Sequence, residues 1–91
     1  MDTATVLQLV KARLGITANV RDTYLTAIIN GVKHELKDEK KITLEAENPN
    51  HLMFVVDLSA WRYNNRDSEG AMPRHLQFRL HNIIIHNGGA I

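Results

Sequence analysis

Residues 48–64 read NPNHLMFVVDLSAWRYN, and this stretch determines how the rest of the chain can be organised. Asn48 can cap a helix, and Pro49 suits the first helical position because its missing N–H needs no partner there. Apolar residues then cover most of the helical circumference, which indicates a helix surrounded by other helices. The short run FVV alone could be a buried strand, but the apolar segment is too long for that. We therefore predict a central helix over residues 49–64.

Three further patterns predict the remaining helices. Residues 3–14 have apolar side chains at three- and four-residue steps and end at Gly15, a residue that favours a left-handed helix end. Residues 20–37 carry the clearest amphipathic stripe, and residues 73–86 begin with a proline. The prediction is an all-α fold, a small compact bundle of four helices with short loops, forming a single domain over residues 1–91.

The apolar stripes of these helices predict the residues of the core. One face of each helix should point inward, because a chain of 91 residues has room for one core only. The predicted core residues are Leu7, Val10, Leu14, Leu25, Ile28, Ile29, Val32, Val56, Trp61, Leu76, Leu80 and Ile84.

Several local signals refine the elements. Asp2 or Thr3 can cap the first helix, and Asn19 resembles a cap for the second. Gly31 lies inside the second helix, where it is costly, and close approach of another helix would explain it. The charged residues 38–48 predict a loop with at most a short turn, and the alternation at Ile42-Thr43-Leu44 is only a weak strand signal.

Composition excludes several classes of protein. Eleven Lys and Arg against ten Asp and Glu give a net charge of +1, which removes the electrostatic case for a dedicated nucleic-acid or membrane-surface binder. The chain has no cysteine, which excludes disulfides and thiolate metal sites. No apolar run approaches the roughly 20 residues that span a bilayer, and the N-terminus lacks signal-peptide blocks. We expect cytosolic synthesis and no membrane segment.

The sequence favours neither a metal site nor catalysis. None of the five histidines is paired at the i, i+3 or i+4 spacing that places two imidazoles on one helical face. No nucleophile elbow and no glycine-rich phosphate loop occurs, and Glu45 and Glu47 fall in a loop that should be solvated. We therefore predict no enzyme activity, no cofactor and no metal ion.

The segment from Trp61 to Arg66, followed by Arg74 and Arg79, mixes aromatic and guanidinium groups as nucleic-acid surfaces do. A structural interpretation competes with this one. Trp61 belongs to the most apolar helix, and Arg62 and Arg66 can bridge to carboxylates or to a neighbouring subunit. The net charge favours the structural interpretation.

Taken together, these residues resemble a known family. Leu14-Gly15-Ile16, the amphipathic helix from Tyr24 to Leu36, the Trp-x-Tyr-x-Asn-Arg series that begins at Trp61, and Pro73 are similar to the small head-tail connector proteins of long-tailed double-stranded DNA bacteriophages and prophages. The resemblance covers roughly residues 6–84.

This resemblance implies a structural, non-enzymatic function in the virion. It implies an all-helical adaptor that assembles as a ring under the portal, as a dodecamer when the portal is its template, with the isolated subunit able to stay monomeric. The ring would extend the DNA channel, let double-stranded DNA pass without sequence-specific binding, and offer a platform to a stopper or tail-completion protein. The protein would lie at the head–tail junction of the virion. Its assembly would take place in the cytoplasm of the bacterial host.

The resemblance places docking to the portal or tail on the last helix and the tail after it. The partner-binding residues it implies are His81, Ile85, His86 and Ile91. A ring also needs heterologous contacts between copies, in which one patch meets a different patch. Mixed-sign charges suit such a contact, although they also suit plain solvation, and the candidates are Arg21, Lys33, Glu35, Glu39, Arg62 and Arg66.

Two alternatives remain open at this point. One is a small helical DNA-binding regulator of prophage origin, and the other is a prophage-encoded interaction protein with an unidentified partner. A regulator needs a tight turn followed by a helix with groove-reading polar side chains. Residues 14–19 offer a turn, but the helix after it has few such side chains.

Overall fold

The computed structural model describes residues 1–68 and 70–86. In this part of the chain the order of elements is α1 (Thr3–Leu14), α2 (Asp22–His34), the π-helical turn η1 (Glu35–Glu39), α3 (Pro49–Asn64) and α4 (Arg74–His86). The all-α prediction is confirmed, and the described residues contain no strand.

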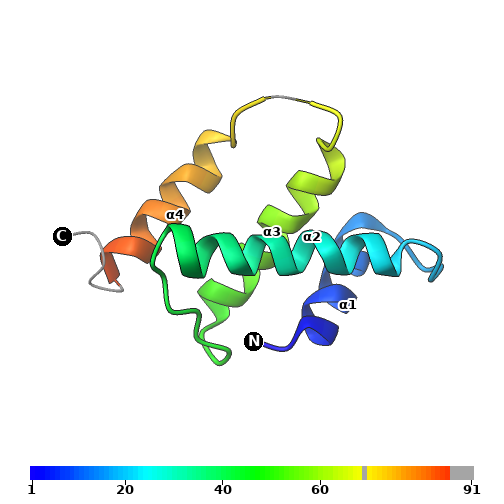
Figure 1. Ribbon diagram of the computed structural model, residues 1–91, viewed down its shortest axis with the longest axis horizontal. Helices are drawn as coiled ribbons and strands as arrows, with labels where there is room; N and C mark the ends of the chain where they lie inside the picture. The colour runs from blue at the N-terminus through cyan, green and yellow to red at the C-terminus, as the bar shows by residue number, and fades with distance from the viewer. Residues whose placement is uncertain (69, 87–91) are drawn as a thin grey trace.

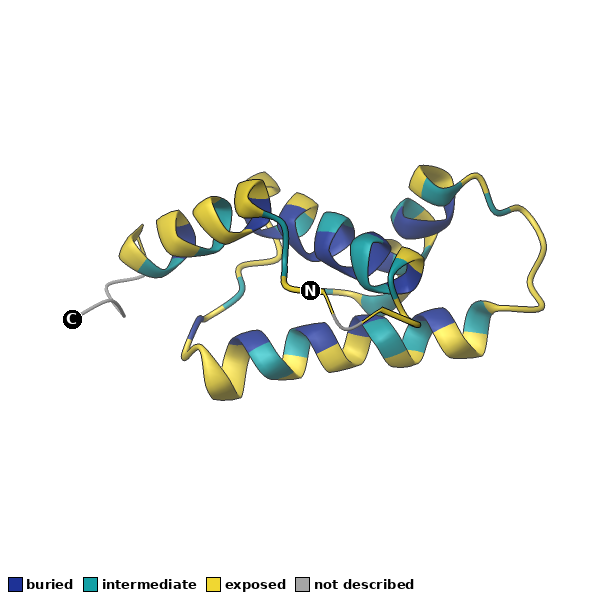
Figure 2. Ribbon diagram, turned by 90° about the horizontal axis from the view of Figure 1, so that it is seen from above, coloured by how far each residue is buried: buried dark blue, intermediate teal, exposed yellow. Residues whose placement is uncertain are grey.

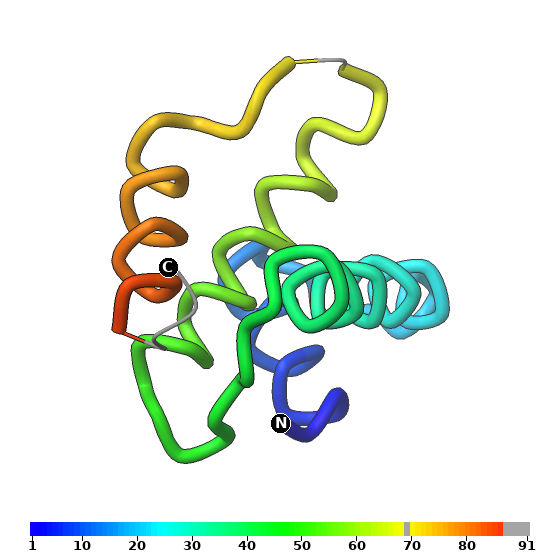
Figure 3. Tube along the Cα trace, turned by 60° about the vertical axis from the view of Figure 1, so that its left-hand side comes forward, coloured from blue at the N-terminus to red at the C-terminus, as the bar shows by residue number. Residues whose placement is uncertain are grey.

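Helix α3 lies at the centre of the molecule (Figure 1). It packs against α1, α2 and α4, and α1 also packs against α2. Helix α4 runs alongside α3 in the opposite direction, after the long connection over residues 65–73 (Figure 3). Among the described elements, α4 contacts α3 alone. The central position predicted for residues 49–64 is confirmed. Among the described α-helices, α4 has the fewest buried residues.

The buried residues agree in part with the core residues predicted from the apolar stripes. On α2 the buried residues face the other helices and the far side is exposed (Figure 2). Half of the predicted core is fully buried: Val10, Leu25, Ile29, Val32, Val56 and Leu76. The other half is only partly buried and packs around the rim of the core: Leu7, Leu14, Ile28, Trp61, Leu80 and Ile84. The core also takes in Val6, Leu36, Ile42, Phe54, Val55, Leu58, Tyr63 and Ile83.

The predicted helix ends are confirmed where a local signal sets them. The Asp2 carboxylate caps α1 by accepting from the Ala4 N–H at 3.3 Å. Gly15 ends α1 with a φ of 72°, a conformation that glycine adopts without strain. The Asn48 side chain accepts from the N–H groups of Asn50 and His51, at 2.9 and 3.3 Å, and so caps α3.

Three boundaries differ from the prediction, by one to two residues at each helix end. Helix α2 begins at Asp22 rather than at residue 20, and the Asn19 side chain accepts from Lys11 instead of capping α2. The helical path continues through η1 to Glu39, past the predicted end at residue 37, and the chain then turns at Lys41, which has a positive φ. Helix α4 begins one residue after Pro73. The turn after η1 places Ile42 in the core, with its N–H donating to the Leu36 carbonyl at 2.9 Å.

The predicted close approach of a helix at Gly31 is wrong within this chain. Gly31 is exposed, and apart from its own helix backbone no atom lies within 4 Å of where a Cβ would stand. Gly31→Ala is therefore expected to raise the free energy of unfolding by about 0.5–1 kcal/mol, because alanine has less backbone freedom to lose. Denaturant unfolding followed by circular dichroism measures this. Gly15→Ala, at positive φ, is the matched control and should lower stability; a lower midpoint for Gly31→Ala would contradict the prediction.

Acidification is expected to loosen the first turn of α1. Hydrogen bonds from the Thr5 hydroxyl and the Ala4 N–H hold the pKa of the Asp2 carboxyl below its ordinary value of 3.8. Because this pKa is lower in the folded chain, the stabilisation is present above about pH 4 and is lost as the pH falls through the folded pKa. Amide exchange at Ala4 and Thr5, corrected for intrinsic rates, should rise at low pH in the wild type. In Asp2→Ala the exchange should be fast at all pH values, and an acid-induced rise of the same size there would contradict this role.

Candidate partner-binding surface

Helix α4 has an apolar stripe on each of two sides. The inner side buries Leu76 and Ile83 against the core. On the outer side Phe78 is 62% exposed and Ile85 is 48% exposed. These two residues are seven apart, so they lie on the same face of the helix, two turns from each other. Large exposed apolar side chains at helical spacing are typical of surfaces that bind another protein.

The charge of α4 is one-sided. Residues 74–86 include two arginines and three histidines and no aspartate or glutamate. Of these five side chains of α4, only Arg79 forms an ion pair within the described residues. His81 lies between Phe78 and Ile85 in sequence and is exposed. The outer face of α4 is therefore apolar with basic and imidazole neighbours.

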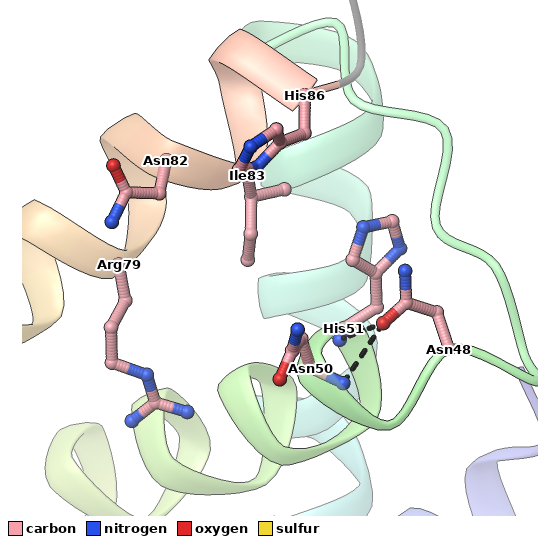
Figure 4. Close-up of a pocket in the computed structure, with 7 residues that line it drawn as sticks. All are labelled: Asn48, Asn50, His51, Arg79, Asn82, Ile83 and His86. Atoms are coloured by element: carbon pink, nitrogen blue, oxygen red, sulfur yellow. Dashed lines mark hydrogen bonds between the residues drawn. The ribbon is translucent and has the colours of Figure 1, made fainter.

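A groove of about 470 Å³ lies between the first turn of α3 and the last turns of α4 (Figure 4). No carboxylate lines it. Asn48, Asn50 and His51 come from the α3 side, and Arg79, Asn82, Ile83 and His86 come from α4.

Asp57 of α3 fixes the position of Arg79. Its Oδ2 accepts from an Arg79 Nη1–H at 2.7 Å, and its Oδ1 lies 3.2 Å from Arg13 Nε of α1. The Arg79 guanidinium also lies over the Phe54 ring, 5.5 Å from its centroid. One carboxylate thus serves two guanidinium groups, and this cluster has a net charge of +1.

His51 joins the groove to the loop before α3. The residue is only 4% exposed, and its Nδ1 accepts from the Glu45 N–H at 3.0 Å. A ring nitrogen that accepts a hydrogen bond carries no proton, so the proton of the neutral ring is on Nε2. His51 is therefore a hydrogen-bond donor at the nitrogen that the loop does not use.

Most of the charged residues proposed for subunit contacts have partners in their own chain. Arg62 Nη2 contacts both carboxylate oxygens of Glu35, at 2.8 and 2.9 Å. Lys33 donates to the Met1 carbonyl and to Thr3 Oγ1, both at 2.9 Å. Glu39 is exposed. The contacts of Lys33, Glu35 and Arg62 therefore connect different segments of the same chain.

Tyr63 gathers two more of these residues. The Arg21 guanidinium donates to the Tyr63 hydroxyl, and Arg66 donates to the Tyr63 carbonyl at 2.6 Å while lying 4.3 Å from the ring centroid. Tyr63 itself is 6% exposed, and Trp61 packs on the core. The aromatic and arginine series of residues 61–66 therefore makes intramolecular contacts, as the structural interpretation predicted.

The described residues offer no site for a metal ion. They contain no group of three His, Cys, Asp or Glu side chains placed to bind one. None of the described helices is long and apolar enough to cross a membrane.

One family match covers nearly all of the four helices. A family model described as phage gp6-like head-tail connector protein matches residues 4–84. The chain belongs to this family. No curated protein and no solved structure matches the chain significantly. The resemblance inferred from the sequence is confirmed, and the connector match includes most of α4.

The connector residues expected to bind a partner are placed as follows. His81 and Ile85 lie on the exposed side of α4, and His86 lines the groove. Ile91 lies outside the described residues. Phe78 was missed, although its seven-residue spacing from Ile85 was a signal that both belong to one exposed stripe.

Proposed function

We propose that this connector protein is a ring subunit at the head–tail junction of the virion. In this proposal the ring lies under the portal, extends the DNA channel and gives the stopper or tail-completion protein a platform. The observation that carries the proposal is the outer face of α4, which exposes Phe78 and Ile85 on a helix that, among the described helices, contacts α3 alone. Apolar side chains with polar neighbours are typical of the centre of a protein interface.

A second exposed patch supports head-to-tail association. Val20 is 86% exposed and Tyr24 is 48% exposed, at the turn between α1 and α2. Arg21 and Arg66 flank this patch through their contacts with Tyr63. The turn and α4 lie at opposite ends of the molecule, whose longest dimension is 42 Å (Figure 1). A ring contact that covers this patch with a different patch of the next copy would therefore leave the outer face of α4 free for the portal.

The proposal includes a dodecamer that forms on the portal and a subunit that is monomeric alone. Each contact orders side chains and removes rigid-body freedom, and these costs oppose assembly of a small subunit without a template. Assembly would occur in the host cytoplasm. DNA would pass through the channel without sequence readout, in keeping with a net charge of only +1.

Light scattering tests this function. The mass of the purified protein is measured alone, with the portal protein encoded near it, and with a labelled DNA duplex. The expected result is a monomer alone and a large complex with portal, and Ile85→Asp should abolish that complex while leaving the helix content unchanged. A small particle that ignores portal and binds duplex in a salt-dependent way would overturn the connector ring in favour of a regulator.

A further inference from the structure

The groove between α3 and α4 presents hydrogen-bond donors that its own chain leaves unused. The side-chain amides of Asn50 and Asn82 are exposed and have no hydrogen-bond partner among the described residues. Arg79 donates one N–H to Asp57, and a guanidinium has five N–H groups. His51 adds the Nε2–H that its bond to Glu45 fixes. Figure 4 shows Arg79 and Asn82 projecting from α4 on one side of the groove, and Asn50 and His51 from α3 on the other.

The local charge favours an anion in this opening. Arg13 and Arg79 share the Asp57 carboxylate, which leaves one positive charge at the Arg79 end of the groove. The groove lining and α4 contain no acidic residue, and Glu45 lies at the other end, in the hollow that it lines with His51 and His86. A carboxylate that reaches Arg79 from outside would form charge-assisted hydrogen bonds, which are roughly twice as strong as neutral ones.

The apolar stripe of α4 adjoins these donors. Asn82 follows Phe78 by four residues and precedes Ile85 by three, so the three side chains share one helix face. Asn82 also lines the groove. A ligand whose acidic group lies in the groove would therefore place its neighbouring atoms on Phe78 and Ile85.

We propose that the groove binds the carboxylate of an acidic side chain on a partner protein, held by Arg79 and the amides of Asn50 and Asn82. Apolar residues beside that acidic residue lie on Phe78 and Ile85. This inference rests on the proposed function, which places the partner at the head–tail junction. It adds the chemistry by which α4 recognises that partner. A DNA backbone fits less well, because duplex binding grows with the number of free Lys and Arg, and Arg79 is the one Lys or Arg among the described residues that line the groove.

Nuclear magnetic resonance with a defined probe tests the site. The probe is the capped peptide acetyl-Leu-Glu-Leu-Phe-amide, and its control is the same peptide with Gln in place of Glu. The glutamate peptide is expected to shift the side-chain N–H signals of Asn50, Asn82 and Arg79 saturably, with the glutamine peptide binding about tenfold more weakly. The double variant Asn50→Ala, Asn82→Ala should also bind about tenfold more weakly. Gln8→Ala, at an exposed position on α1, is the matched control and should bind like the wild type.

Three results would overturn the inference. Equal affinity for the two peptides would show that the groove does not select a carboxylate. Unchanged affinity in the double variant would place the peptide elsewhere. Displacement of the peptide by a DNA duplex from the same signals would assign the groove to phosphate.

The connector function is tested separately, in the mixture with portal. If the wild type forms the large complex and the double variant forms it with equal affinity, the groove inference fails and the ring proposal stands. If the wild type forms no complex, the ring proposal fails, and a selective response to the glutamate peptide still supports the groove.

Discussion

Phe78→Asp is expected to weaken the complex with portal by about 100-fold or more while the subunit stays folded. Buried aromatic anchors dominate the energetics of protein interfaces, and truncating one typically costs 2 kcal/mol or more, about 30-fold in affinity. The introduced carboxylate adds repulsion if the partner is acidic, as proposed for the groove. The free subunit should tolerate the change because Phe78 is 62% exposed and substitutions at such positions usually change stability by less than about 0.5 kcal/mol.

The measurement is the affinity for portal, with thermal unfolding of the free subunit beside it. Met53→Asp is the matched control, because Met53 is an exposed apolar residue (42%) on α3 rather than α4. Phe78→Leu should retain part of the affinity, since it keeps an apolar group at the site. Wild-type affinity in Phe78→Asp would rule out the outer face of α4 as the docking surface.

The sequence allowed accurate prediction of the helices whose ends have local signals. The caps at Asp2 and Asn48 and the left-handed Gly15 depend on residues within one turn, so a single sequence is sufficient to find them. The end of α2 could not be placed in this way. The helical path continues through η1, where Arg62 of α3 binds Glu35, 27 positions earlier in the sequence. No local pattern contains that contact.

The partner-binding surface was only half predictable for a related reason. A stripe of apolar residues identifies the buried side of α4, but the exposure of Phe78 depends on how few helices contact α4. The groove joins residues 48–51 to residues 79–86, and these segments meet only because α4 folds back along α3. The charge of Arg79 likewise depends on Asp57 being shared with Arg13. These properties belong to the packing of distant segments.

Asp22→Ala is expected to lower the free energy of unfolding by about 2–3 kcal/mol, a large part of the roughly 5–15 kcal/mol typical of a small domain. The side chain of Lys11 is only 6% exposed, and its ammonium contacts Asp22 Oδ1 and Asn19 Oδ1, each at 2.9 Å. Removing the carboxylate leaves a buried charge with one neutral partner. The expected loss is below the 3–5 kcal/mol of a fully buried pair because 31% of the Asp22 side chain is exposed to water.

The reverse substitution separates a buried charge from a simple lost contact. Lys11→Met should cost less than Asp22→Ala, because the methionine fills the buried space and the Asp22 side chain that remains is partly exposed to water, although its Oδ1 is buried. Adding Lys11→Met to Asp22→Ala should then restore stability. Urea unfolding measures all three variants, with unchanged m-values expected and Asp67→Ala, an exposed residue after α3, as the control. If the double variant is less stable than Asp22→Ala alone, the Lys11 charge is not what makes the loss of Asp22 costly, and the pair stabilises the α1–α2 corner by packing instead.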